Sequence, residues 1–271
     1  MIDLHLHTTA SDGRLTPTQL VTRAGAAGLK IIAVTDHDTT AGLGEASGAA
    51  AAAGLTFVSG IEITAIEQGQ DIHILGYFFE PHDRQLAEFL GAQRTNRVKR
   101  VQRIADRLHA LGVPIDTTPL LERARQGVSV GRPHVADALV AAGHAADRTD
   151  AFDRLIGRGR PAFVERCGAS AAEVVGVIRG AGGLASLAHP GLTRRDDLLP
   201  SLVDFGLGAV EVRHSDHDIA LEAHYRSLAA QHGLAVTGGS DYHGDGSRHS
   251  AALGGVTLPE EDFIALRERV R

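Results

Sequence analysis

The chain opens with Met1-Ile2-Asp3-Leu4-His5-Leu6-His7, a stretch in which apolar and polar side chains alternate. Because successive side chains on a strand point to opposite faces, His5 and His7 share one face and the two leucines face an apolar layer. A carboxylate follows at Asp12 in the next loop. Two adjacent imidazoles and a carboxylate favour the start of a metal site, although a surface strand with two solvated histidines explains this stretch alone equally well.

The composition is that of a globular protein. Of 271 residues, 43% are apolar and 22% charged, and the length suits one barrel-sized domain or one domain with an insertion. The sequence starts directly at the first strand without the regions of a signal peptide, and no apolar run reaches membrane-spanning length. A single cysteine, Cys167, excludes an intramolecular disulfide. We therefore expect a cytoplasmic protein with no membrane association and no obligate protein partner.

Charge is unevenly distributed along the chain. The net charge is −6, yet the segment from Arg84 to Arg166 holds 15 Lys and Arg residues against 9 Asp and Glu residues. The remainder is therefore strongly acidic. An acidic body that binds cations, beside a basic segment, suits a small anionic substrate better than a long nucleic acid duplex.

Short apolar runs alternate with helical segments over most of the chain. Pro17 opens a helix that ends near Gly28, an apolar run follows, and the same order returns after Ser170. This alternation is typical of βα units around a parallel sheet, so we predict an α/β fold. The predicted strands are 2–6, 30–34, 55–59, 71–77, 183–188, 208–212 and 234–237.

The alternation of short apolar runs with helical segments stops at about Pro81. Apolar residues then recur at three- and four-residue steps, which predicts an amphipathic helix over 84–111. Further helices are expected near 119–125, 133–142 and 149–156, with a strand at 161–164. We predict that residues 82–167 form an inserted, basic helical domain that caps the substrate, and that 1–81 and 168–271 form the barrel. The basic face of the long helix is expected to be mostly solvated: Arg94, Arg97, Lys99, Arg100, Arg103 and Arg107.

Nine candidate metal ligands lie on or near the predicted strand ends. In barrels of βα units the carboxyl ends of the strands carry the active site. Seven candidates lie at or just after such ends, whereas Asp12 lies in a loop and His73 within its strand. The nine are His5, His7, Asp12, His37, Glu62, His73, His189, Asp241 and His243.

Nine nitrogen and oxygen ligands are too many for one ion, because a catalytic ion usually takes three or four. The set implies two or three divalent ions with a bridging carboxylate. Imidazole and carboxylate without thiolate suit Mn, Fe or Zn. Two neighbouring cations generate a hydroxide and clamp both oxygens of an in-line displacement, which is the chemistry that phosphate ester hydrolysis needs.

These residues occur in motifs that resemble, in order, those of the polymerase and histidinol phosphatase (PHP) superfamily. The motifs are His5-Leu6-His7 with Asp12, Thr35-Asp36-His37, Gly60-Ile61-Glu62, His73, Ala188-His189-Pro190 and Gly239-Ser240-Asp241-Tyr242-His243. The resemblance implies a distorted (β/α)7 TIM-like barrel with a trinuclear centre, and we favour Mn²⁺ over Fe²⁺, Zn²⁺ or Mg²⁺. It assigns one ion to His5, His7, Glu62 and Asp241, a second to Glu62, His73 and His189, and a third to Asp12, His37 and His243.

Two motifs in the insertion, Gly131-Arg132-Pro133-His134 and Gly159-Arg160-Pro161, resemble the inserted domain of bacterial PHP phosphoesterases of the TrpH/YciV type. That subgroup implies hydrolysis of the 3′-phosphate of nucleoside 3′,5′-bisphosphates and, in some members, 5′-to-3′ trimming of short RNA. Independently, the forked donors of arginine suit a phosphate. Pro133 in the first helical turn would place Arg132 at a helix N-terminus, which also favours an anion.

Several further polar residues are candidates for catalysis or substrate binding. Arg132 is predicted to hold the phosphoryl group, and Arg160 either binds substrate or lies on the surface. His134 would bind phosphate, protonate the leaving oxygen or simply pack under the first helix. Asp36, next to His37, would orient that ligand or carry a proton.

Glu211 and His214 end a predicted strand on the active side of the barrel, so we expect them to contact ribose or base. Asp245 and His249 lie in a Gly-rich loop near the site and stay undecided. The remaining polar residues near these motifs are expected to be solvated: Asp38, His217, His224 and His232.

Three other functions compete with the bisphosphate phosphatase. Amidohydrolases also begin with a His-x-His strand, but many need a bridging lysine, and Lys30 and Lys99 are placed at a strand start and in the insertion. Histidinol phosphatases share the metal site but do not account for the arginine-rich insertion. A non-catalytic, metal-stabilised module that binds nucleotide or RNA fits the basic helix, although aromatic residues make up only 4% of the chain.

Overall fold

Seven strands form one sheet in sequence order in the computed structural model, which describes residues 1–244 and 252–270. The backbone of Leu4 donates to the carbonyl of Gly238, and Leu6 pairs in parallel with Tyr242, so the first and last strands nearly close a barrel. This confirms the distorted seven-stranded barrel. The strands are β1 (Ile2–Asp3), β2 (Ile31–Val34), β3 (Thr56–Glu67), β4 (Gln70–Tyr77), β5 (Leu184–Leu187), β6 (Ala209–Arg213) and β7 (Ala235–Gly238).

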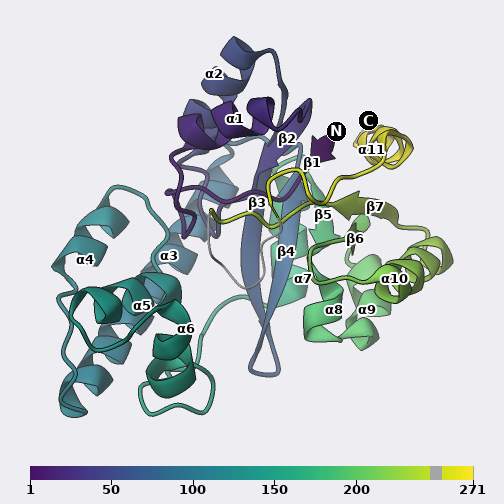
Figure 1. Cartoon of the computed structure of the whole chain (residues 1–271). Coiled ribbons are helices and arrows are strands. Elements are labelled where there is room, and N and C mark those ends of the chain that lie inside the picture. The colour runs from purple at the N-terminus through teal and green to yellow at the C-terminus, as the bar shows by residue number, and fades with distance from the viewer. Residues whose placement is uncertain (245–251, 271) are drawn as a thin grey trace.

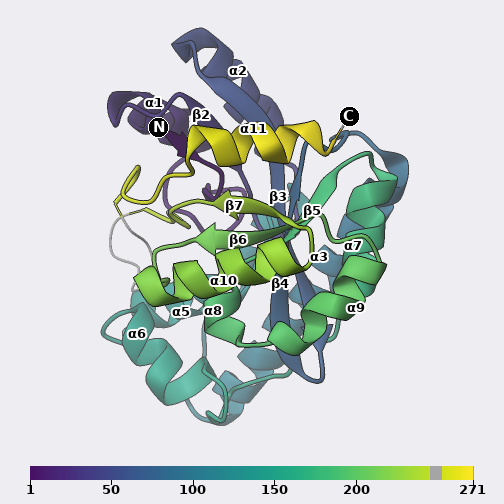
Figure 2. The ribbon, with the colours of Figure 1, turned by 90° about the vertical axis from the view of Figure 1, so that its right-hand side faces the viewer.

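Helices cover the outside of this sheet (Figures 1 and 2). Their apolar side chains pack with those of the strands in one buried core. Helix α1 begins with a capping box formed by Thr16 and Gln19. Among the described residues, no helix is both long and apolar enough to cross a membrane. The barrel helices are α1 (Pro17–Ala26), α2 (Leu43–Ala53), α7 (Ala171–Gly180), α8 (Pro190–Thr193), α9 (Leu199–Asp204), α10 (Ile219–Gln231) and α11 (Glu260–Glu268), with a short 3₁₀ turn at Asp196–Leu198.

The strand β4 runs antiparallel to both β3 and β5, whereas the other pairs are parallel. The expectation of uniformly parallel βα units was therefore wrong here. Gln68 and Gly69 both have positive φ angles, so a two-residue hairpin joins β3 to β4 in place of a helix. Because β4 is reversed, its beginning lies at the rim where the parallel strands end.

The barrel closes next to the opening motif through Asp3. This buried carboxylate accepts hydrogen bonds from the backbone of His5 and from the backbone and hydroxyl of Ser240. Burial raises the pKa of Asp3 to about 6. The strand β1 ends at Asp3 itself, so His5 and His7 lie just beyond it rather than within the predicted strand.

The insertion is a helical lobe beside the barrel (Figure 1). The predicted strand at 161–164 was wrong, because the carbonyls of Phe163 and Val164 accept from the guanidinium groups of Arg107 and Arg100 rather than from a neighbouring strand. Its helices are α3 (Arg84–Ala110), α4 (Thr118–Arg125), α5 (Arg132–Ala141) and α6 (Arg148–Ala151), and α6 continues into a π-helical turn at Phe152–Ile156.

Helix α3 belongs to two apolar cores. Leu86 and Leu90 in its first half pack in the barrel core, whereas Ile104 and Leu108 pack with residues of the inserted helices such as Leu139. The division between the cores therefore lies within this helix, and α3 holds the insertion rigidly against the barrel.

A buried ion pair reinforces this junction. The Nε of Arg97 lies 2.5 Å from Oδ2 of Asp38, and both residues are buried. The other oxygen of Asp38 accepts from the backbone of Thr64, whose hydroxyl accepts from Arg97. The expectation that Asp38 and Arg97 are solvated was wrong, because each neutralises the other across the junction. Arg100 is also buried.

His217 is a further residue that sequence reasoning placed at the surface. It is buried, with Nδ1 2.8 Å from the carbonyl of Val212, and Nε2 accepts from the backbone of Gly191. It thereby supports α8. His224 is exposed and pairs with Asp196, as expected of a surface residue.

Candidate metal centre

The structure brings all nine candidate ligands together at one rim of the barrel. Three groups made up of candidate ligands have donor atoms within 4.8 Å of one another, and a fourth such group joins His5 to Glu211 and His214. His189 joins them through Nε2, which lies 3.0 Å from Glu62. The groups are His5, His7, Glu62 and Asp241; His7, Asp12, His37 and His243; and His37, Glu62 and His73.

Glu62 lies at the centre of this cluster and is 1% exposed. Its Oε2 lies 3.1–3.4 Å from three imidazoles, and its Oε1 lies 2.6 and 3.0 Å from two others. A carboxylate so placed suits a bridge between cations. The imidazoles are those of His5, His7 and His37 around Oε2, and of His73 and His189 around Oε1.

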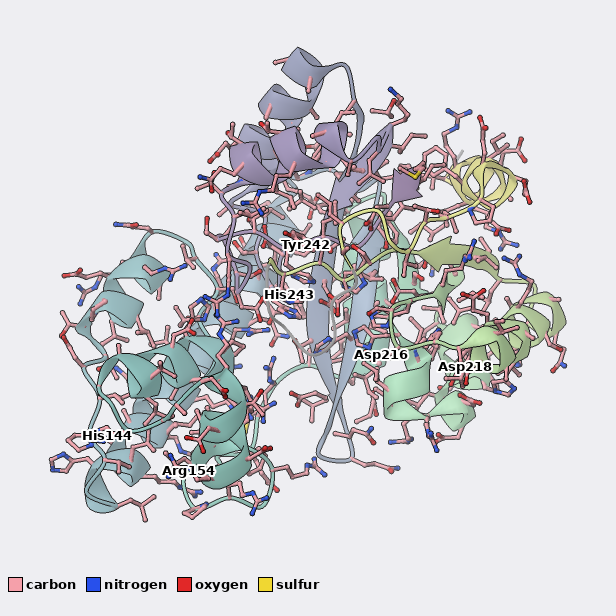
Figure 3. The ribbon with its side chains drawn as sticks, in the orientation of Figure 1. His144, Arg154, Asp216, Asp218, Tyr242 and His243 are labelled. Carbon is pink, nitrogen blue, oxygen red and sulfur yellow. The ribbon has the colours of Figure 1, made fainter. Side chains whose placement is uncertain are left out.

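The backbone explains why distant residues meet here. His37 follows β2, and His73 near the start of the reversed β4 pairs with Thr64 two residues beyond Glu62. His189 follows β5 with a φ angle of 26°, and Asp241 follows β7 with a φ angle of 53°. Strained backbone conformations of this kind occur preferentially at functional sites. The segment after β7, which carries His243, passes in front of β3 and β4 in Figure 3.

Unpaired polar atoms are concentrated in the cluster. Buried polar groups in proteins normally have hydrogen-bond partners. Among the described residues, eleven buried side-chain nitrogen and oxygen atoms have none, and eight of them belong to candidate ligands. Divalent cations would satisfy this mixed set of imidazole and carboxylate donors, so the residues fit the expected metal centre. The eight atoms are His5 Nε2, His7 Nδ1 and Nε2, Asp12 Oδ1, His37 Nδ1, Glu62 Oε2, His189 Nδ1 and Asp241 Oδ1.

The electrostatics of the cluster also favour cations. Burial by itself would raise the pKa of Glu62, but His37, His73 and His5 hold that pKa well below its usual range. Burial disfavours a charged His7, yet the carboxylates of Asp241 and Glu62, 3.0 and 3.2 Å from its Nε2, raise its pKa to about 10. The carboxylates therefore require positive charge between them. Divalent ions bound to neutral imidazoles would supply it and release protons on binding.

Comparison with known proteins gives the family. Residues 3–155, more than half of the chain, match the model of the PHP domain. The chain belongs to the PHP domain family. This confirms the resemblance drawn from the sequence motifs.

Named relatives of this PHP-domain protein cover most of its length. A 3′,5′-nucleoside bisphosphate phosphatase from Chromobacterium violaceum is 35% identical over 91% of this chain and 89% of the relative. A phosphoribosyl 1,2-cyclic phosphate 1,2-diphosphodiesterase from Eggerthella lenta is 38% identical over 89% of this chain and 94% of the relative. A 5′-3′ exoribonuclease from Escherichia coli is 35% identical over 89% of this chain and 84% of the relative. Each name describes cleavage of a phosphoester.

A solved structure has the same architecture. A protein from Bifidobacterium adolescentis, described as a metal-dependent phosphoesterase by inference, superposes with a TM-score of 0.90. It is 35% identical in sequence, and the match covers 99% of this chain and 96% of that one. The likeness therefore includes the insertion as well as the barrel.

Two residues of this PHP-domain protein, Glu211 and His214, lie on the buried side of the metal-ligand cluster and not on its exposed side. Glu211 lies 2.9 Å from Nδ1 of His5 and accepts from the backbone of His189, and His214 lies 3.4 Å from Asp241. Both are buried. The expectation that they contact ribose or base was wrong, because their polar atoms contact the candidate ligands and orient them.

Asp36 and His134, both predicted to be catalytic, are buried structural residues. Asp36 accepts three hydrogen bonds from Thr8 and Ser11, which fixes the loop after β1. The Nδ1 of His134 accepts from the backbone of Gly131, and Nε2 lies 2.8 Å from the carbonyl of Ser11. Both nitrogens of His134 are therefore occupied, so it neither binds phosphate nor protonates a leaving group.

The cluster opens into a cavity of about 490 Å³ between the barrel and the insertion. Besides four histidines and three carboxylates of the rim, several residues that the sequence did not single out line it. No sequence motif marks them, because they come from the loop after β1, from α6 and the π-helical turn that continues it, and from α8. They are Arg14, Arg148, Thr149, Phe152, Asp153 and Leu192.

A second cavity of about 440 Å³ adjoins the first, and Leu192 lines both. Arg132, which was predicted to hold the phosphoryl group, lines this second cavity and not the first. Arg160 is exposed and, within the described part of the chain, lines neither cavity, which contradicts its assignment to substrate binding. Other basic residues of the second cavity are Arg100, Arg158 and Arg166.

Positive charge in the second cavity is only partly balanced. Burial and repulsion from Arg132 and Arg166 lower the pKa of Arg100 to about 9. Two carboxylates, Asp71 and Glu165, line this cavity with the four arginines, and Asp71 lies 3.4 Å from Nε of Arg166 and 3.8 Å from Arg132. The Nε of Arg166 has no hydrogen-bond partner. The second cavity therefore suits a small, doubly charged anion.

Proposed function

We propose that this PHP-domain protein, a metal-dependent phosphoesterase, removes the 3′-phosphate of nucleoside 3′,5′-bisphosphates and leaves the 5′-monophosphate. The observation that carries the proposal is the pair of adjoining cavities, one with the metal-ligand cluster and one lined by arginines. His73 lines the first cavity and Asp71 lines the second. Both lie on the same face of β4, with their Cα atoms about 7 Å apart. Because the two cavities adjoin, a molecule with two phosphates on one ribose matches them.

In this proposal the nine rim residues hold two or three divalent ions, of which we favour Mn²⁺. When bound, the ions would activate water and neutralise the phosphoryl oxygens. Glu62 lies where it would bridge them, and Glu211 and His214 hold His5 and Asp241 in orientation. The preference for Mn²⁺ rests on the donor set and not on an observed geometry.

The 5′-phosphate would bind in the arginine cavity. Arg132 is the first residue of α5, so the positive end of the helix dipole adds to the attraction for an anion. Arg166 also lines this cavity, and a bidentate contact with phosphate is the strongest interaction open to a guanidinium group. The insertion would thus cap the substrate, because it supplies both the arginines and one wall of the first cavity.

The same two cavities support a second activity, 5′-to-3′ trimming of short RNA. A 5′-phosphorylated RNA end would place its terminal phosphate among the arginines and its first phosphodiester at the metal cluster. The relative named as a 5′-3′ exoribonuclease favours this candidate. Histidinol phosphate carries one phosphate and leaves the arginine cavity without a function.

The proposal predicts a strong dependence on the 5′-phosphate. With Mn²⁺ present, adenosine 3′,5′-bisphosphate should release phosphate with a much higher kcat/KM than 3′-AMP does. Arg132→Ala should lower kcat/KM for the bisphosphate by roughly 10- to 100-fold, because a charged hydrogen bond is lost. The change for 3′-AMP should be much smaller.

Arg160→Ala is the matched control, because that arginine is exposed and lies outside both cavities. Faster hydrolysis of histidinol phosphate than of the bisphosphate would contradict the proposal, and so would equal losses for both nucleotides in Arg132→Ala. Binding of nucleotide without any turnover would favour the non-catalytic module instead.

A further inference from the structure

Phe152 occupies a special position in the wall of the metal-cluster cavity. Histidines apart, it is the one aromatic residue among those that line this cavity in the described chain. It begins the π-helical turn Phe152–Ile156 that continues α6. Single π-helical turns occur frequently at functional sites, where they redirect a side chain.

The ring of Phe152 is held in place by Arg132. The guanidinium carbon of Arg132 lies 5.6 Å from the centre of the Phe152 ring and 5.7 Å from that of Phe163. Phe152 lines the first cavity, and Arg132 and Phe163 line the second. These three side chains therefore form the wall between the two anion sites, and cation–π contacts make the wall rigid.

An exposed apolar side chain lies on the barrel side of these two cavities. Leu192 in α8 is 47% exposed and lines both cavities. It is three residues beyond His189, so its position is tied to the cluster. In Figure 1, α6 and α8 lie on opposite sides of the β3–β4 hairpin. A flat apolar ligand that entered from the cavity would cover Leu192, which is favourable.

We propose that Phe152 and Leu192 form a nucleobase subsite between the metal cluster and the arginine cavity. This inference rests on the proposed function, because the ribose that joins the two phosphates would carry its base to the wall between their sites. The base stacks on the ring of Phe152, and Leu192 covers it from the barrel side. Stacking is available to every base, so the subsite selects nucleotides over plain sugar phosphates without selecting one base.

The experiment compares adenosine 3′,5′-bisphosphate with the same ribose bisphosphate lacking the base, in the metal-loaded protein. Stacking should give the wild type a preference of roughly 10- to 100-fold in kcat/KM for the nucleotide. Phe152→Leu keeps an apolar side chain but removes the ring, so this ratio should fall close to one. Phe152→Trp should restore the preference, and Leu192→Ala should lower it partially.

Phe163→Leu is the matched control. Phe163 contacts Arg132 as closely as Phe152 does but lines the other cavity, so this variant should keep the nucleotide preference even if it weakens binding of both substrates. The subsite is refuted if the wild type treats both substrates alike, or if Phe152→Leu lowers both rates by the same factor.

A failure of the proposed function has a different signature, because neither substrate would then release phosphate. Calorimetric binding of 5′-AMP and ribose 5-phosphate tests the subsite in that case without turnover. Tighter binding of 5′-AMP that disappears in Phe152→Leu supports the subsite, and equal binding of both ligands overturns it.

Discussion

Replacement of Glu62 by glutamine is expected to abolish phosphate release and to lower the number of bound metal ions. Both oxygens of Glu62 face imidazoles of the cluster, and its Oε2 has no hydrogen-bond partner. Loss of an outer residue that only orients a metal ligand costs about 10- to 100-fold in activity or affinity. Loss of a bridging ligand should cost clearly more, on the order of 1,000-fold, because the charge between two cations is removed.

Two further variants set a scale for the loss of activity in Glu62→Gln. Glu211→Gln should show the smaller loss, because that side chain contacts His5 and His189 from behind the cluster. Glu88→Gln, on the exposed surface of α3, should behave as the wild type. Metal content by mass spectrometry and phosphate release are measured together. Full activity and full metal content in Glu62→Gln would contradict the assignment of Glu62.

Replacement of Asp38 by asparagine is expected to destabilise the protein by about 3–5 kcal/mol, because it leaves Arg97 buried without its counter-charge. Asparagine tolerates the left-handed backbone at this position, where φ is 51°, so the variant removes charge without adding backbone strain. The free energy of unfolding is measured by urea denaturation.

The double variant Asp38→Asn with Arg97→Met distinguishes a coupled pair from two independent residues. Each single variant leaves one buried partner without the other, whereas the double variant removes both, so its loss should be well below the sum. Arg84→Met, in the exposed pair Arg84–Glu88, should change stability by less than about 0.5 kcal/mol. Additive losses for Asp38 and Arg97 would show that the contact does not join the insertion to the barrel.

The sequence predicted the positions of the rim residues well for a physical reason. Carboxyl ends of parallel strands meet at one rim, so His37, His189 and Asp241 could be grouped from strand ends alone. His73 did not fit that rule. Periodicity shows that residues 70–77 form a strand but not in which direction it runs, and the reversal at Gln68-Gly69 explains why His73 lies at the same rim.

Depth within the site could not be predicted. Glu211 and His214 end a strand at the correct rim, yet they lie behind the ligands, because strand position does not tell which side chains face solvent. The basic face of α3 shows the same limit. The pattern that predicted a solvated helix contained no sign that Asp38 would meet Arg97, or that Arg100 would line a cavity with Arg166, more than sixty residues later.

The central claim is that residues remote in sequence hold a cluster of divalent ions at one rim of the barrel. Anomalous diffraction at the manganese edge from crystals of the active, Mn²⁺-loaded protein tests it most directly. We predict two or three peaks within coordinating distance of Glu62 and its surrounding histidines, with one peak also close to Asp12. An active crystal form whose ions lie elsewhere, or that has no peak beside Glu62, would contradict the account.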